Sequence, residues 1–470
     1  MLLRRRAAAD GAVDGTTGER MGTAVAGGGV TAIGDATATA SAIADGGAGT
    51  GRASAPMGFT EFVVLIAAMM ATQAIAIDAM LPAFPIIVHA MHVANENHGQ
   101  WILTAYMAGL GCGQLFWGMM SDRFGRRPVL LLGLGGYVAA ALLCGLTNNF
   151  HALLIFRFVH GLAAASVTVG RSVIRDLYSG RHMARVMSLT FVVFLMVPVL
   201  APSLGQLILL VAPWRYIFIA CGVFACIVWL WSLMRLKETL HPEYRMPLTR
   251  SHIAGAVRLV LGNRTSLCYT LGLTIMFAST MAYVGMVQQI FSDVFHRPGL
   301  MPGMFALCAA TMGVAALVNS RVVERLGMRL ISHAALLCFI GITVLHVVVA
   351  ALGDERLWTF VAFQAATMAC FSLSVSNFGA MAMEPIGAVA GIGASLQGFI
   401  STFGAALVGA AIGRNFSGTT LPLAAGALGC GLLALVFVLF AEKGRLFRSH
   451  HVATATGAAD GAAAGGVGIH

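Results

Sequence analysis

The chain has 470 residues, of which 58% are hydrophobic and only 10% are charged. A soluble domain carries about 25% charged residues, so this composition excludes an ordinary water-facing protein and predicts one that faces lipid. A net charge of +10 would suggest nucleic acid in a soluble protein. Here the basic residues stand between apolar runs, so membrane topology explains them and no nucleic-acid partner is expected.

Twelve apolar runs predict an all-α membrane protein with twelve transmembrane helices. Each run is long enough to cross a hydrocarbon core of about 30 Å, and each is continuously apolar, unlike the alternating strands of a membrane β-barrel. The predicted helices cover residues 60–88, 99–120, 128–147, 151–174, 184–211, 214–236, 266–292, 302–320, 330–351, 356–381, 388–412 and 420–441.

Polar segments divide the chain into five predicted regions. Residues 1–57 and 443–470 are rich in Gly and Ala and hold no apolar run, which predicts disordered tails. The polar stretch 237–265 predicts a central loop with an amphipathic segment. It separates a six-helix bundle at 58–236 from a second six-helix bundle at 266–442.

The distribution of Lys and Arg predicts the orientation of these helices. If both tails lie on one side of the membrane, that side collects 24 of the 29 Lys and Arg residues. The opposite side then holds only Arg215, Arg297, Arg356 and Arg414, and Arg157 lies inside a span. Because cytoplasmic loops carry the excess of basic residues, both tails and the central loop are predicted to be cytoplasmic.

The turn after the second span combines charges with glycines in the stretch GMMSDRFGRRPV. Positive-inside anchoring explains its arginines but not Asp122, because a carboxylate at a membrane edge needs an arginine or a helix N-terminus to stabilise it. The turn therefore predicts either a simple anchor or a latch that holds one conformation closed. Its candidate residues are Gly118, Asp122, Arg123, Gly125, Arg126 and Arg127.

A fainter copy of this turn follows the eighth span, where the chain reads VERLGMR. Glu324, Arg325 and Gly327 stand there in the order that acid, arginine and glycine have in the first copy. The matching positions indicate an internal repeat of six helices, which is one way in which secondary transporters are built.

The costliest charged residues inside predicted spans are Asp78 in the first and Arg157 in the fourth. A charge at mid-membrane costs about 2.5–3.5 kcal/mol on insertion scales, so such residues usually face a cavity or a partner. At 1.5 Å per residue both lie roughly 9–15 Å below the outer surface, so they could share one layer. Asp78 can also be read as an interfacial residue, and Arg157 as a donor to backbone carbonyls. His160, on the same helix face as Arg157, either titrates near neutral pH or only packs.

The fifth span contains Pro198 and Pro202, which share one helix face, and Gly205. Each proline removes a backbone donor, so this span is predicted to kink or loosen. The kink is either merely tolerated or a bend that lets the two halves close. Amides inside other spans either line a substrate cavity or bridge helices. The cavity candidates are Gln73, Gln114, Gln288, Gln289, Gln364 and Asn377.

No metal, cofactor or enzyme activity is expected. The nine cysteines all fall inside predicted spans and form no CxxC pair, which is typical of small apolar helix residues. His89, His92 and His98 share one predicted external loop without an acid or cysteine cluster to complete a metal site. No phosphate-binding G-x-x-x-x-G-K-[ST] loop is present that would indicate a nucleotide-driven pump.

The pattern G-x-x-x-D-R-x-G-R-R resembles the signature loop of the major facilitator superfamily. The stretches DAMLPAFP (78–85), RFVHG (157–161), VPVLAPSLGQ (197–206) and AMEPIGAVAGIGAS, before the eleventh span, resemble the bicyclomycin-resistance (Bcr/CflA) group of drug:proton antiporters. The resemblance covers about residues 58–442. The sequence departs from that group at His160, where Gln is frequent, and at Gln206, where a second Gly is frequent.

The resemblance implies the twelve-helix major facilitator fold and a monomeric transporter in a bacterial inner membrane. Such a transporter would exchange small, partly apolar compounds for protons by alternating access. On this reading Asp78, Arg157 and His160 couple protons, and the fifth-span motif is associated with antiport. Two alternatives stay open: a metabolite importer or sugar exporter of the same fold, and a non-transporting membrane sensor.

Overall fold

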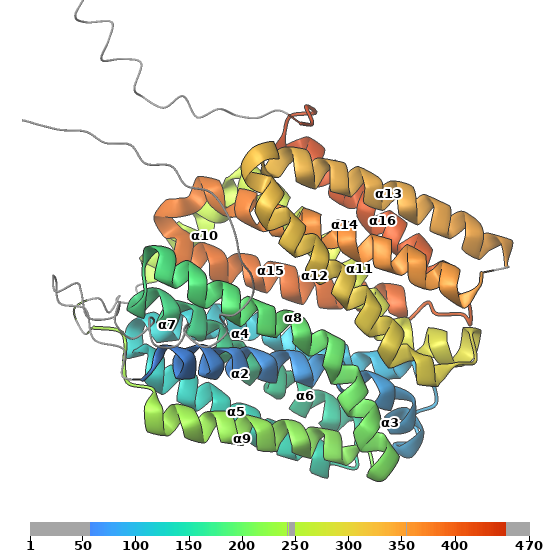
Figure 1. The fold of residues 1–470 in the computed structure, drawn as a ribbon, viewed down its shortest axis with the longest axis horizontal. Helices are drawn as coiled ribbons and strands as arrows, with labels where there is room; N and C mark the ends of the chain where they lie inside the picture. Colours follow the sequence, from blue (N-terminus) through green and yellow to red (C-terminus); the bar gives the residue numbers. More distant parts are fainter. Residues whose placement is uncertain (1–56, 242, 244–249, 354, 448–470) are drawn as a thin grey trace, which may run out of the picture. The chain divides into compact units, whose positions relative to one another are not determined.

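Helices account for most of the part of the chain that the computed structural model describes, which is residues 57–241, 243, 250–353 and 355–447 (Figure 1). The predicted disordered tails lie outside the described residues, apart from Met57 and residues 443–447. All of the described residues belong to one compact unit, which covers residues 53–470.

The first half of the chain has a helix at each of the first six predicted spans. The first of these, α2, continues through a short 3₁₀ turn (Leu81–Ala83) into α3. The fourth is built from α6 and α7, joined by a 3₁₀ turn. The helices are α2 (Phe59–Asp78), α3 (Phe84–Ala90), α4 (Gln100–Phe124), α5 (Arg126–Leu146), α6 (Phe150–Ala164), α7 (Val169–Leu177), α8 (Gly180–Val211) and α9 (Arg215–Arg235).

The second half likewise has a helix at each of the last six predicted spans, and a further helix, α10, precedes them. The helix α10 is the amphipathic segment expected in the central stretch. Its side chains Val257 and Val260 pack with Ile386 and Leu396 near the start of α15. The helices are α10 (Arg250–Gly262), α11 (Arg264–Gln289), α12 (Met301–Leu326), α13 (Met328–Leu352), α14 (Leu357–Met383), α15 (Ala390–Gly413) and α16 (Leu421–Ala441).

Ten helical segments among the described residues are long and apolar enough to cross a membrane. The helices α4 and α8 stand at the second and fifth predicted spans but are not among these ten, although Met196–Val211 of α8 is a shorter apolar stretch. Large apolar side chains are also exposed, for example Leu210 at 73% and Val211 at 82%, as expected of surfaces that contact lipid. The all-helical, multi-pass architecture is therefore confirmed, while the count of twelve spans stays a prediction.

Glycines bring the helices around the buried charges into close contact. A Cβ atom on Gly109 of α4 would lie 1.9 Å from the carbonyl oxygen of Phe158, and one on Gly161 of α6 would lie 1.8 Å from that of Tyr106. A Cβ atom on Gly205 of α8 would lie 2.0 Å from the carbonyl oxygen of Ala79. Only glycine permits such approaches, so these three positions bring α6 onto α4 and α8 onto the end of α2.

Candidate functional site

A cavity of about 590 Å³ lies between helices of both halves of the chain. The first half contributes side chains of α2, α4, α7 and α8, and the second half contributes α11 and α15. Asp122 in the last turn of α4 and Gly391 in the first turn of α15 both line it. The cavity therefore lies toward the end of the helices that carries the α4–α5 turn (Phe124–Arg127), which we call the turn end.

Two of the predicted cavity residues, Gln73 and Gln114, line this cavity, together with Gln397. The Gln114 side chain donates a hydrogen bond from Nε2 to Thr402 Oγ1 at 3.3 Å, which links α4 to α15. Met70, Met183 and other apolar side chains supply much of the remaining wall.

The other four predicted cavity residues are buried elsewhere and are not among the described lining residues. Asn377 donates from Nδ2 to Asn319 Oδ1 at 2.9 Å and so bridges α14 and α12. Gln288 and Gln364 are buried, and Gln289 takes part in contacts at the opposite end of the helices. None of these four residues lines this cavity in the part of the chain that the structure describes, and their role as cavity residues stays a prediction.

The end opposite the turn end, which we call the far end, is closed by neutral amides. Gln100 Nε2 donates to Gln289 Oε1 at 2.9 Å and to the carbonyl oxygen of Gly413 at 3.1 Å. Gln289 Nε2 donates to Asn97 Oδ1 at 2.9 Å, and Asn97 Nδ2 donates to the carbonyl oxygens of Arg414 and Phe416. This amide network joins the start of α4 to the ends of α11 and α15.

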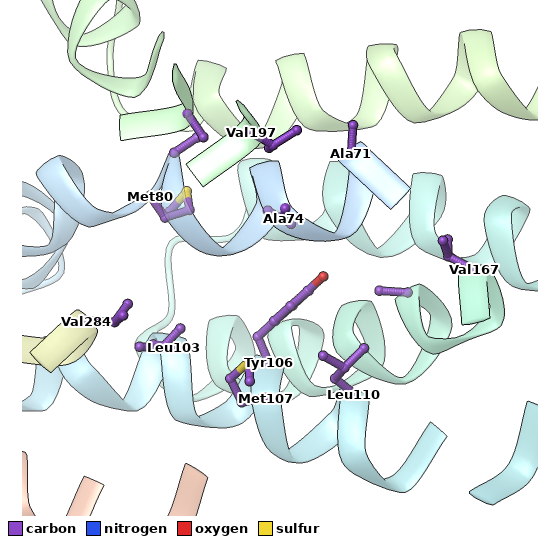
Figure 2. Close-up of a cluster of buried hydrophobic side chains, with 14 of the residues drawn as sticks. Ala71, Ala74, Met80, Leu103, Tyr106, Met107, Leu110, Val167, Val197 and Val284 are labelled. Carbon is purple, nitrogen blue, oxygen red and sulfur yellow. The ribbon is translucent and has the colours of Figure 1, made fainter. Parts of the chain in front are cut away.

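Apolar side chains form a layer close to the amide network. Figure 2 shows Leu103 and Met107 of α4 in one buried cluster that also contains Val284 of α11 and Met80. Each of these side chains is at most 5% exposed. Apolar packing and the amide network therefore act together to close the far end.

In the α4–α5 turn, the buried Arg126 is the centre of a charge cluster. Its guanidinium bonds Asp122 Oδ1, Asp176 Oδ2 at 3.0 Å and Ser121 Oγ at 2.8 Å. All of these partners belong to the first half of the chain. Within the described residues no hydrogen bond joins Asp122 to α15, so a latch between Asp122 and the second half is not engaged in this conformation.

The same turn also depends on Glu238, which follows α9. The Glu238 carboxylate accepts hydrogen bonds from the backbone N–H groups of Arg126 and Arg127 at 2.9 and 3.2 Å and so caps the start of α5. Gly125 has a φ of +104°, and a Cβ atom there would lie 2.4 Å from Glu238 Oε2. Glycine is therefore favoured at position 125 by its backbone angle, and any larger residue would also have to displace the Glu238 carboxylate.

The remaining predicted turn residues have simpler surroundings. Gly118 is where α4 meets α15, since a Cβ atom on it would lie 2.5 Å from Ser395 Oγ. The Arg127 side chain donates to the carbonyl oxygen of Leu233 at 2.9 Å, and Arg123 lies over the ring of its neighbour Phe124.

The repeat expected after the eighth span is present in the backbone. Gly327 has a φ of 78° and a ψ of 154°, close to the 104° and 160° of Gly125, and each glycine starts the next helix. Glu324 and Arg325 are exposed and form no hydrogen bond or ion pair with any other described residue. The second copy thus keeps the glycine turn without the acid cluster of the first copy.

A second charged cluster lies beside this repeat. Arg329 Nε bonds Glu442 Oε1 at 2.8 Å, and Tyr269 donates its hydroxyl to the same oxygen at 2.6 Å. Burial favours a higher pKa for Glu442, but the hydrogen bonds from Tyr269 and Arg329 outweigh it and lower the pKa below the ordinary value of 4.5. Glu442 therefore binds an arginine side chain at the start of α13, whereas Glu238 accepts from backbone N–H groups at the start of α5.

Arg157 of α6 is fully buried, and its side chain binds the backbone of α4 and α2. Its Nε donates to the carbonyl oxygen of Ile102 in α4 at 3.2 Å, and its NH2 group donates to that of Ala76 in α2 at 3.2 Å. The guanidinium also lies 4.4 Å from the centre of the Tyr106 ring. The alternative that Arg157 binds backbone carbonyls therefore describes its observed contacts.

His160 lies in the same buried layer. Its Nδ1 is 3.3 Å from the NH1 group of Arg157, and its ring packs between the rings of Tyr137 and Tyr106, with centroids 4.1 and 5.3 Å away. Both tyrosines donate their hydroxyl hydrogens to carbonyl oxygens of α2, at Thr72 and Gln73. Figure 2 shows Tyr106 extending from α4 toward α2.

Asp78 is the last residue of α2, and its exposed fraction is 6%. Within the described residues it forms no hydrogen bond and no ion pair, and none joins it to Arg157. Arg157 nevertheless binds the carbonyl of Ala76, two positions earlier, so both residues lie at a similar depth. The shared layer that the sequence predicts is therefore present, whereas a direct pair between the two residues is absent here.

In the fifth span, Pro198 and Pro202 lie inside α8, which is assigned as one helix from Gly180 to Val211. The helix therefore continues through both prolines, and the kink or loosening expected there stays a prediction. Gly205, one turn beyond Pro202, is the point of contact with Ala79, the residue directly after Asp78. The fifth-span motif and the buried carboxylate are thus neighbours in space.

Sequence reasoning missed several residues of this site. Asp176 and Glu238 bind Arg126 across 50 and 112 positions, and Asn97 and Gln100 meet Gln289 across about 190 positions. Asp176 and Glu238 each follow a predicted span closely in the sequence, but nothing in the neighbouring residues indicated that both would bind Arg126.

Comparison with known proteins places the chain in a family. Residues 62–409, more than half of the chain, match the Major Facilitator Superfamily. The chain is 27% identical over 403 residues to "Multidrug resistance protein MdtL" of Shigella dysenteriae, covering 83% of this chain and 98% of that protein. It is 28% identical over 367 residues to "Bicyclomycin resistance protein homolog" of Haemophilus influenzae, covering 77% and 91%. Both names agree with the resemblance to the bicyclomycin-resistance group.

A solved structure supports the same assignment at the level of the fold. The peptide transporter POT in complex with sulfate aligns with a TM-score of 0.68 at 14% identity, covering 82% of this chain and 94% of that one. The match over residues 62–409 shows that the chain belongs to the major facilitator superfamily of membrane transporters.

Proposed function

We propose that the protein exports drugs or other small, partly apolar compounds in exchange for protons, by alternating access. The observation that carries this proposal is the cavity of about 590 Å³, which both halves line at the turn end while the amide network closes the far end. A cavity that lies toward one end of the helices, while the other end is closed, is the arrangement expected of one state of an alternating-access transporter.

The direction of access follows from the distribution of Lys and Arg. Because 24 of the 29 basic residues lie at the turn end or in segments predicted on the same side, we assign the turn end and both termini to the cytoplasm of a bacterial inner membrane. The cavity then receives its substrate from the cytoplasm, and release requires the amide network to open. The two halves come from one chain, so a monomer suffices.

Asp78 is our candidate for the proton carrier. Burial of an ionised carboxylate without a partner is costly, so Asp78 can hold its proton while buried and lose it when water or a cation reaches it. Arg157 binds the carbonyl of Ala76 beside it, and Gly205 of α8 touches Ala79 on its other side. A shift of α2 between the two conformations would thus move Asp78 relative to both of its neighbours.

The variant Asp78→Asn tests the proton-carrier role. We expect it to insert normally and to lose proton-driven efflux of any compound that the wild-type protein exports, measured in everted vesicles over a range of pH values. The compound is identified first with a panel of antibiotics and dyes in an efflux-deficient host. The matched control is Asp293→Asn, an exposed carboxylate near the far end that forms no part of the proposed machinery.

Efflux by Asp78→Asn with full pH dependence would disprove the proton-carrier role. If no compound in the panel shows a shift for the wild-type protein, drug export itself is wrong, and a metabolite transporter or a sensor of the same fold is favoured.

A further inference from the structure

Two arginines of α7, Arg171 and Arg175, line the cavity. They are four residues apart, so they lie on one face of the helix, and both are exposed. Neither forms a hydrogen bond or an ion pair with any residue that the structure describes. An arginine in a membrane protein normally binds a partner or marks a substrate path, and these two face open space.

The other charge on the cavity wall is already neutralised. Asp122 is the only acidic side chain among the described lining residues, and it is paired with Arg126, which also binds Asp176. The two arginines therefore leave the cavity with an excess of positive charge.

Membrane anchoring does not account for both arginines. Arg175 stands in the last turn of α7 and can serve as an anchor at the membrane edge. Arg171 lies one turn deeper, about 9 Å from the end of α7 at 1.5 Å per residue. The side chain of Arg171 faces the same space as Gln73 and Gln114, which suits contact with a substrate better than contact with lipid headgroups.

We infer that the cavity selects amphiphilic organic anions, with Arg171, aided by Arg175, binding the carboxylate or sulfonate of the substrate. The guanidinium offers paired N–H donors that match such a group, while Met70, Met183 and Leu273 provide apolar contacts for the rest of the molecule. This inference rests on the proposed transport function of the cavity and names the substrate class that it takes.

The test compares 2-naphthoate with 2-naphthamide, which share one ring system and differ in the charge of a single group. Binding to the purified full-length protein is measured by equilibrium dialysis at pH 7.5, at low and high salt. We expect the wild-type protein to prefer 2-naphthoate, and this preference to weaken at high salt. Arg171→Gln should lose about tenfold in affinity for 2-naphthoate and less than twofold for 2-naphthamide, because only the charged ligand uses the guanidinium.

Two further variants sharpen the result. Arg171→Lys keeps the charge but not the paired donors and should lie between the wild-type protein and Arg171→Gln. Arg321→Gln removes an exposed arginine of α12 that is not among the described lining residues and should leave both affinities unchanged. If Arg171→Gln does not reach the membrane, Arg171→Lys and the salt dependence of the wild-type protein still decide the question.

A wild-type protein that binds 2-naphthoate no more tightly than 2-naphthamide overturns the inference, and so does an Arg171→Gln variant that weakens both ligands equally. These outcomes are separate from failure of the proposed function. Selective binding of the anion without efflux of any compound would support the assigned ligand class while refuting export.

Discussion

Gln100 of α4 and Gln289 of α11 share a hydrogen bond of 2.9 Å, although 189 positions separate them along the chain. Their exposed fractions are 6% and 8%, so neither amide has free access to water. Gln100 also reaches the carbonyl of Gly413 at the end of α15. One side chain of the first half thus contacts two helices of the second half at the far end.

Replacing Gln100 should make the far end open more often. Gln100→Leu has a similar volume but removes two hydrogen bonds, each worth about 0.5–1.5 kcal/mol net, so the open population should rise roughly tenfold. A cysteine introduced at Thr104, one turn further along α4 from Gln100, reports the opening. It reacts with a membrane-impermeant maleimide added on the side of the membrane that the far end faces. Thr104→Cys without Gln100→Leu and Gln100→Leu alone are the controls, and equal labelling rates with and without Gln100→Leu would contradict the gate.

Arg126 should matter more for folding than Asp122 does. Its side chain is 5% exposed and binds Asp176, so Arg126→Ala leaves a largely buried carboxylate unpaired, which costs about 3–5 kcal/mol. Asp122→Asn leaves Arg126 paired with Asp176 and Ser121. We expect membrane abundance to fall several-fold for Arg126→Ala and to stay near the wild-type level for Asp122→Asn.

Transport by Asp122→Asn then decides between latch and anchor. Loss of transport at unchanged abundance supports the latch, because it shows that Asp122 acts after folding. Loss of abundance together with transport assigns Asp122 to folding of the turn instead, and full transport leaves it no role beyond the turn.

The contact between α4 and α6 should tolerate no added methyl group. A Cβ atom at Gly161 would lie 1.8 Å from the carbonyl oxygen of Tyr106, so Gly161→Ala must push α6 away from α4 and disturb the contacts of Arg157. Overpacking of this kind typically costs about 1–3 kcal/mol or more. The matched control is Gly303→Ala in α12, where nothing lies within 4 Å of the added atom. The melting temperature in detergent should fall for Gly161→Ala only.

Glu442 should make stability depend on pH in the acidic range. Its pKa in the folded protein is lowered by Tyr269 and Arg329, so it stabilises the fold while the pH is above the ordinary pKa of 4.5 and loses this contribution as the pH falls below that value. Glu442→Gln removes the charge at all pH values. The difference in melting temperature between the wild-type protein and Glu442→Gln should therefore be largest near neutral pH and shrink as the pH falls through 4.5. A difference that stays constant would show that Glu442 acts only through packing.

Sequence patterns predicted the helices well and the contacts between them only in part. A helix that spans a membrane needs a continuous apolar run, and such a run is a local property that can be read along the chain. The predicted spans 99–120 and 128–147 correspond to the helices Gln100–Phe124 and Arg126–Leu146. The two helices run closer together than predicted, because the single residue Gly125, with its positive φ, ends one helix and starts the next.

The partners of the charged residues could not be read in the same way. Asp176 and Glu238 both reach Arg126, but their pairing depends on how α7 and the segment after α9 pack around α5. The amides Gln73, Gln114 and Gln289 look alike in sequence, yet two line the cavity and one closes the far end. Whether an amide lines the cavity or contacts another helix depends on how its own helix is rotated about its axis. A span that is apolar on all faces does not define that rotation.

The two ends of the helices are held by different chemistry, and this difference has a consequence for control. Amides and carbonyls close the far end, and these groups neither gain nor lose charge with pH. At the turn end, contacts between carboxylates and Arg126 are sensitive to ionic strength wherever water reaches them. Changes in the salt concentration or acidity of the medium should thus act mainly on the contacts at the turn end, while the hydrogen bonds that close the far end keep the same strength.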